Sequence, residues 1–127
     1  MKATELMIGD WVCLKDDIKS ELPLKVDGVL IDDISLEGEG FLGGVDGLVR
    51  PISLTPEILE KNGFVELKLD EGSSTILWEY YPWNIEYDIT NDEYYGMRGE
   101  IKIEYVHQLQ HILRLYGENE LADNFKI

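Results

Sequence analysis

Two histidines near the end of the chain are the residues whose type and spacing come closest to a metal site. His107 and His111 lie four positions apart, and Glu104 lies three positions before the first of them. On a helix this spacing turns two imidazoles and a carboxylate roughly toward one side, which is a partial zinc ligand set. A zinc site needs three or four converging ligands held by further hydrogen bonds, and the sequence has no third histidine. We therefore expect structural or solvated histidines and no metal ligand.

A glycine-rich segment, residues 38–43, reads Gly-Glu-Gly-Phe-Leu-Gly and fits the pattern of a dinucleotide-binding turn. The pattern binds phosphate only where a strand leads into it and a helix begins directly behind it. The following residues, Gly44 to Gly47, are unsuited to begin a helix, and Glu37 and Glu39 would repel a phosphate. We expect a hairpin tip here and no cofactor.

Sequence patterns of nucleophilic and nucleotide-hydrolysing enzymes are missing from the chain. It has no Gly-x-Ser-x-Gly elbow and no Walker loop, and its single cysteine, Cys13, lies in an apolar, strand-like run. A carboxylate pair suited to glycoside hydrolysis stays open, but such a pair needs a cleft that a short chain rarely forms. The sequence predicts a protein that is not an enzyme, with no catalytic and no cofactor-binding residue.

The charge balance is strongly acidic, with 26 Asp and Glu against 11 Lys and Arg and a formal net charge of -15. Phosphate backbones and anionic lipids repel such a chain, so we expect neither direct nucleic-acid binding nor membrane binding. The better-matched partner is another protein, and a basic one in particular.

One stretch, between Lys68 and Arg98, contains no basic residue and interleaves carboxylates with aromatic rings. Its aromatic residues are Trp78, Tyr80, Tyr81, Trp83, Tyr87, Tyr94 and Tyr95. Aromatic anchors in acidic surroundings suit the binding of a basic protein, although strand alternation also allows half of these rings to be core. The residues predicted to bind a partner are Trp83, Tyr94, Tyr95, His107 and Gln108.

The first half of the chain, which must position Cys13 and the glycine-rich segment, reads as short strands separated by turns. The predicted strands are 11–14, 24–31, 34–36 and 45–52, and the turns are Gly9-Asp10, Asp27-Gly28 and Asp46-Gly47. Strands of this length and spacing predict an SH3-like bent sheet or small barrel.

The second half reads as helix, antiparallel β-meander and helix. Thr55, Pro56 and Gly63 are the cap, first-turn and exit residues of a helix over 55–62. Predicted strands follow at 64–70, 75–81, 84–89 and 99–105, then a helix at 106–116 packed on the meander and a short helical turn within 118–125. The fold class is α+β and mostly antiparallel β, in a single domain, 1–127, with 1–54 and 55–127 as its two halves.

Three segments carry a resemblance that covers nearly the whole chain: 6–12, 52–64 and 103–110. They resemble a family of small uncharacterised proteins from anaerobic gut bacteria and their prophages or mobile elements. The resemblance implies a cytoplasmic protein and supplies no activity, cofactor or catalytic residue. The sequence itself points to the same compartment, because Gly9-Asp10 follows Met1 to Ile8 before any apolar run reaches signal-peptide length.

Three classes of function stay open from the sequence. The favoured class is a protein-binding or adaptor module, which also allows a homo-oligomer formed through an exposed sheet edge. The alternative is an acidic decoy that mimics nucleic acid and inhibits a DNA-binding protein. A small enzyme of unknown type is the third.

Overall fold

The computed structural model describes residues 6–15, 21–29, 34–36, 40–42, 49–68, 72–96 and 100–127. Its elements are antiparallel strands and short helices, so the chain has the predicted α+β class. Contacts divide the chain into two compact units. The first unit comprises Met1–Ser53, Tyr105–Phe125 and Ile127, and the second comprises Leu54–Glu104 and Lys126.

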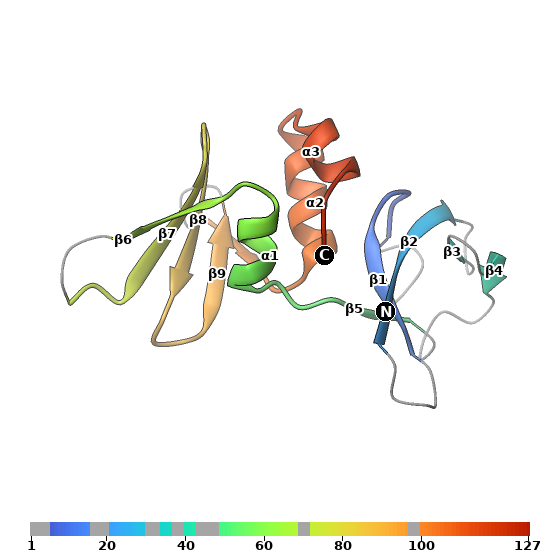
Figure 1. Cartoon of the computed structure of the whole chain (residues 1–127), viewed down its shortest axis with the longest axis horizontal. Helices are drawn as coiled ribbons and strands as arrows, with labels where there is room; N and C mark the ends of the chain where they lie inside the picture. The colour runs from blue at the N-terminus through green and yellow to red at the C-terminus, as the bar shows by residue number, and fades with distance from the viewer. Residues whose placement is uncertain are drawn as a thin grey trace. The chain divides into compact units, whose positions relative to one another are not determined.

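The sheet of the first unit is a bent antiparallel sheet with the strand order β4-β3-β2-β1-β5 (Figure 1). Its strands are β1 (Trp11–Lys15), β2 (Glu21–Val29), β3 (Ile34–Leu36), β4 (Gly40–Leu42) and β5 (Val49–Pro51). The long strand β2 pairs first with β1 and then with β3, and its register with β3 shifts between Val26 and Gly28. Such a bulge bends a strand, which produces the predicted bent sheet.

Two local predictions for this sheet need correction. The hairpin turn predicted at Asp27-Gly28 is wrong, because both residues lie inside β2 at its bulge. In the glycine-rich segment, Gly40–Leu42 is strand β4, which pairs with β3, and the segment is therefore not only a hairpin tip. The other residues of that segment, and the predicted turn at Asp46-Gly47, lie outside the described residues.

Helices α2 (Val106–Leu115) and α3 (Asn119–Asp123) belong to the first unit and confirm the two predicted C-terminal helices. The apolar side chains of α2 recur at helical spacing and are buried: Val106, Leu109, Ile112 and Leu113. Ala122 of α3 and Phe125 behind it are 0% and 1% exposed, so the end of the chain is part of the core. Tyr116, which we expected in the same stripe, is 43% exposed at the end of α2.

A fully buried glutamine joins α2 to the first sheet. Gln110 accepts a hydrogen bond from the backbone N–H of Trp11 (3.0 Å) and donates to the carbonyls of Gly9 (2.9 Å) and Ala122 (3.0 Å). The indole of Trp11 in turn donates to the carbonyl of Phe125 at 2.6 Å. These hydrogen bonds tie α2 to the start of β1, a contact that the sequence did not predict.

The second unit begins with α1 (Pro56–Lys61), which confirms the predicted helix at 55–62. Thr55 is its N-cap and accepts a hydrogen bond from the backbone N–H of Ile58 at 3.2 Å, and Pro56 occupies the first turn. Behind the helix, Gly63 has a φ of 86°, a left-handed conformation that a side chain would disfavour. The chain therefore turns directly from α1 into the meander.

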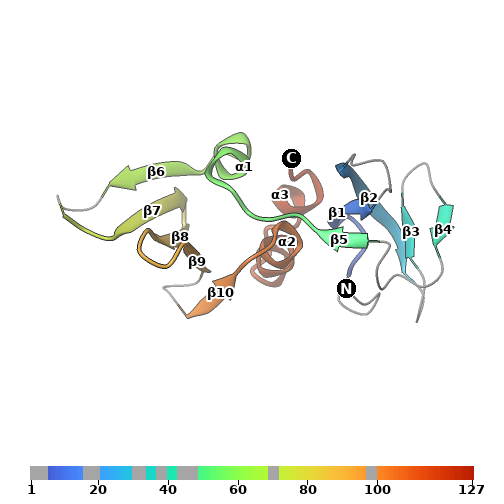
Figure 2. The same cartoon turned by 90° about the horizontal axis from the view of Figure 1, so that it is seen from below.

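The meander has the strand order β10-β9-β8-β7-β6, and every neighbouring pair is antiparallel (Figure 2). Its strands are β6 (Val65–Lys68), β7 (Thr75–Tyr80), β8 (Trp83–Asp88), β9 (Glu93–Gly96) and β10 (Ile101–Ile103). The four predicted strands are confirmed with somewhat different ends. Strand β9 was missed, because its four residues follow directly on turn residues and end in glycine.

One face of the meander is core. Paired residues of neighbouring strands share a face, and the register sets Trp78 against Ile85 and Tyr94 against Ile103. All four are at most 6% exposed, and the Tyr94 ring lies 4.7 Å from that of Tyr87. Within the part of the chain that the structure describes, no helix is long and apolar enough to cross a membrane.

Candidate functional site

The opposite face of the meander gathers carboxylates from three neighbouring strands. Glu86 of β8 pairs with Tyr95 of β9, and Asp88 pairs with Glu93. On its other side, Glu86 pairs with Leu77 of β7, and Glu79 lies two positions beyond Leu77 on that strand. Because side chains two apart on a strand point to the same face, all four carboxylates share it. We call this surface the acidic face and define it by Glu79, Glu86, Asp88 and Glu93.

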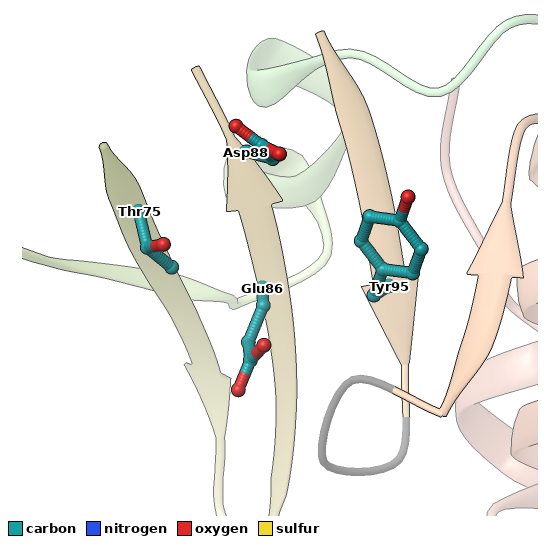
Figure 3. Close-up of a pocket in the computed structure, with 4 residues that line it drawn as sticks. All are labelled: Thr75, Glu86, Asp88 and Tyr95. Atoms are coloured by element: carbon teal, nitrogen blue, oxygen red, sulfur yellow. The ribbon is translucent and has the colours of Figure 1, made fainter. Parts of the chain in front are cut away.

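A shallow hollow of about 290 Å³ lies on the acidic face. Thr75, Glu86, Asp88 and Tyr95 line it, and Figure 3 shows the four side chains arranged across β7, β8 and β9. Two carboxylates and two hydroxyls offer acceptors to a positively charged group, and the size suits one long side chain of a partner.

Glu93 is held at one end of the acidic face by two partners. The hydroxyl of Tyr95 donates a hydrogen bond to its carboxylate, and Lys102 Nζ lies 3.1 Å from Glu93 Oε1 and 3.2 Å from Glu104 Oε1. The Tyr95 hydroxyl and the Lys102 ammonium lower the pKa of Glu93, and the same hydrogen bond raises the pKa of Tyr95. The carboxylates around Lys102 raise the pKa of that lysine. Glu93 is therefore already paired within the protein.

Asp88 has a structural task in the turn between β8 and β9. Its carboxylate accepts hydrogen bonds from the backbone N–H of Thr90 (3.0 Å) and from the side-chain amide of Asn91 (2.8 Å). In the same turn the Tyr87 hydroxyl donates to Asp92 at 2.6 Å, which raises the pKa of Tyr87.

Glu79 and Glu86 differ from the other two members of the acidic face. Within the described part of the chain, neither makes a hydrogen bond or an ion pair, and both are partly exposed. They are the carboxylates of this face that are free to meet a partner.

The five residues predicted to bind a partner do not form one cluster. Trp83 and Tyr94 lie on the core face of the meander, and Tyr94, 6% exposed, has its pKa raised by burial. Tyr95 lies on the acidic face. His107 and Gln108 belong to the first unit, where His107 is 5% exposed and the Gln108 side chain accepts a hydrogen bond from the Tyr105 backbone N–H at 3.1 Å. Of the five, Tyr95 lines the hollow, together with Glu86 and Asp88, which the sequence did not single out.

The helical histidines take part in structural contacts. His111 Nε2 lies 2.6 Å from Asp10 Oδ2, and the His107 ring packs edge-on against the His111 ring with centroids 5.6 Å apart. Asp10 is 0% exposed and also pairs with Arg114, whose Nη1 lies 2.7 Å from Asp10 Oδ1. In the described ranges, no group of three or more His, Cys, Asp or Glu is placed to hold a metal ion.

The turn before β1 brings Asp10 into this cluster. Gly9 has a φ of 93°, and a Cβ there would come within 2.8 Å of Arg114 Nη2. A side chain at this position would therefore strain the backbone and displace the guanidinium from Asp10. The sequence predicts the turn at Gly9-Asp10 but gives no sign that Asp10 is buried.

Comparison with known proteins adds no functional assignment. No protein-family model, curated protein or solved structure matches the chain. The function must accordingly be inferred from the residues and geometry of this chain.

Proposed function

We propose that the protein is a cytoplasmic, non-enzymatic protein-binding module whose acidic face engages a basic segment of a partner protein. The observation that carries the proposal is the pair Glu79 and Glu86, which are partly exposed and have no partner in the described ranges. Carboxylates left unpaired on a structured sheet keep their charge available for association. Lys102, the described cation of the same face, is occupied by Glu93 and Glu104.

A lysine or arginine side chain of the partner would enter the hollow beside Glu86. Its positive group would donate hydrogen bonds to the carboxylates of Glu86 and Asp88, while the Tyr95 ring and the Thr75 methyl group would contact its apolar stem. The net charge of -15 would attract a basic partner from a distance and speed the encounter. Charge of this kind acts on the association rate and is weakened by salt.

The test compares two charge-matched double variants as tagged baits in a pull-down from native host lysate, with capture quantified by mass spectrometry. Glu79→Gln with Glu86→Gln removes two charges from the acidic face. Glu57→Gln with Glu60→Gln removes the same charge from exposed positions on α1 in the second unit. The proposal predicts that a basic protein is lost from the first bait and retained by the second. Equal capture by both baits would contradict it.

The same experiment separates an adaptor from a decoy that mimics nucleic acid. Each bait is washed at low and at moderate salt, with and without competing duplex DNA. If the protein is a decoy, DNA displaces its partner, and the affinity of that partner falls steeply with salt, because the partner's binding surface is built for phosphates. A partner that survives the DNA supports the adaptor.

A further inference from the structure

The strand β6 is an outer strand of the meander and presents an unused edge. One side of β6 pairs with β7 from Val65 to Lys68, and within the described ranges no strand pairs with the other side. A free edge offers a row of backbone N–H and C=O groups that an extended chain can pair with.

The side chains beside this edge are apolar and exposed. Val65 is 60% exposed and Leu67 is 38% exposed, and both point to the face that carries Glu79. At the end of β7, Tyr81 is 85% exposed. A hollow of about 470 Å³ runs along these residues, and its lining consists of Gly63, Val65, Leu67, Glu79, Tyr80 and Tyr81.

Acidic residues flank the apolar edge on both faces of the sheet. Glu66 lies between Val65 and Leu67 on the strand and points to the opposite face, where it is exposed. Glu79 is paired with Val65 across the strands and forms part of the hollow. The edge is therefore apolar along one face and negative next to it.

We propose that the β6 edge binds an extended segment of a basic partner protein as an added strand, in which a lysine or arginine stands between two apolar residues. The inference rests on the proposed protein-binding function and names the partner's local chemistry. In an added strand, side chains alternate between faces, so the two apolar residues would lie beside Val65 and Leu67. The basic residue between them would lie beside Glu66, and the hollow would take the apolar residue nearer to Tyr81.

Charge favours this occupant over a second copy of the chain. Self-pairing of β6 would bring another chain of net charge -15 to the edge and another Glu66 close to the first. A basic segment instead neutralises Glu66 as it pairs. The edge and the acidic face then serve one kind of partner.

The test uses synthetic peptides of alternating isoleucine and lysine, titrated against the full chain and followed by NMR chemical shifts. Strand addition uses the backbone N–H groups of alternate peptide residues only. N-methylation of one alternate set should therefore abolish binding, while N-methylation of the other set should leave it nearly unchanged. Equal effects of the two methylated peptides would overturn the proposal.

Charge reversal at the edge gives a second measurement that a misfolded variant cannot imitate. Glu66→Lys should weaken the lysine peptide at least tenfold and create binding of the matching glutamate peptide, whereas the control Glu60→Lys on α1 should do neither. Unchanged preference in Glu66→Lys, absence of binding by any peptide, or concentration-dependent dimerisation through β6 would each overturn strand addition. If lysine peptides bind but respond only to Glu79→Gln with Glu86→Gln, strand addition fails while the proposed function stands.

Discussion

Asp10 in the first unit and the pair Glu79 and Glu86 in the second unit are held in opposite ways. In the first unit, Asp10 is fully buried and both of its oxygens have partners, from Met7 N–H, His111 and Arg114. In the second unit, Glu79 and Glu86 are partly exposed and unpaired within the described ranges. Burial of an unpaired charge is costly, so a buried carboxylate must be matched within the fold. An exposed one is under no such demand, and this difference separates polar groups that stabilise the fold from those available to a partner.

The largest expected effect is the loss of stability when Asp10 is replaced. Asp10→Ala leaves the Arg114 guanidinium, whose side chain is 13% exposed, without its buried counter-charge and Met7 N–H without its acceptor. Removal of one member of a buried pair costs about 3 to 5 kcal/mol of the free energy of unfolding. Urea denaturation followed by far-UV circular dichroism measures this loss.

Asp123 provides the matched control because it contacts the same arginine from the surface. Its Oδ1 lies 3.4 Å from Arg114 Nε, and its side chain is 60% exposed. Asp123→Ala should cost less than about 1 kcal/mol, as exposed ion pairs do. If the two alanine variants lose similar stability, the contrast between buried and exposed carboxylates does not hold in solution.

A glutamine pair on α2 provides a smaller version of the same contrast. Gln110 is 0% exposed and has three hydrogen-bond partners, so Gln110→Leu leaves one N–H and two carbonyls without theirs. We expect a loss of about 2 to 3 kcal/mol, since each buried polar group left unpaired costs about 1 kcal/mol or more. Gln108→Leu removes the hydrogen bond from the Tyr105 backbone N–H at a half-buried helix start and should cost about 1 kcal/mol. Equal losses, measured by urea denaturation, would show that the buried hydrogen bonds of Gln110 stabilise the fold no more than the partly exposed one of Gln108.

Local signals were enough to predict most elements of this fold. Thr55, Pro56 and Gly63 define α1 because a cap, a first-turn proline and a left-handed exit each act within a few residues. The apolar spacing of α2 likewise predicts a helix, since periodicity depends only on the helix itself.

Long-range contacts could not be predicted in this way. The partners of Gln110 include Trp11, 99 positions away, and nothing local distinguishes Gln110 from the more exposed Gln108. The hydrogen bonds that tie α2 to Gly9 and Trp11 were not predicted for this reason. The aromatic stretch shows the same limit, because alternation separates Tyr94 from Tyr95 but does not tell which of them faces the core. The acidic face required the strand register, which brings Glu86 and Tyr95 together from two strands.

The smallest predicted effect is a pH dependence of stability, and it distinguishes Glu93 from the other carboxylates of the acidic face. Because the Tyr95 hydroxyl and Lys102 lower the pKa of Glu93 below the usual value of a glutamate, its carboxylate stabilises the fold at higher pH. This contribution is present above the unfolded pKa and is lost as the pH falls through the lower folded pKa. The stability difference between the native protein and Glu93→Gln should therefore shrink on acidification through that window, as followed by urea denaturation at a series of pH values.

Tyrosine variants decide whether the hydrogen bond from Tyr95 causes this pH dependence. The Tyr95 hydroxyl is the largest cause of the lowered pKa of Glu93, so Tyr95→Phe should move the NMR titration of the Glu93 carboxyl toward higher pH. Tyr81→Phe, at an 85% exposed position, should leave that titration in place. An unchanged Glu93 titration in Tyr95→Phe would mean that Lys102, and not the Tyr95 hydroxyl, lowers the pKa of Glu93. A shifted titration would show that both partners hold Glu93, which leaves Glu79 and Glu86 as the charges of the acidic face that are available to a partner.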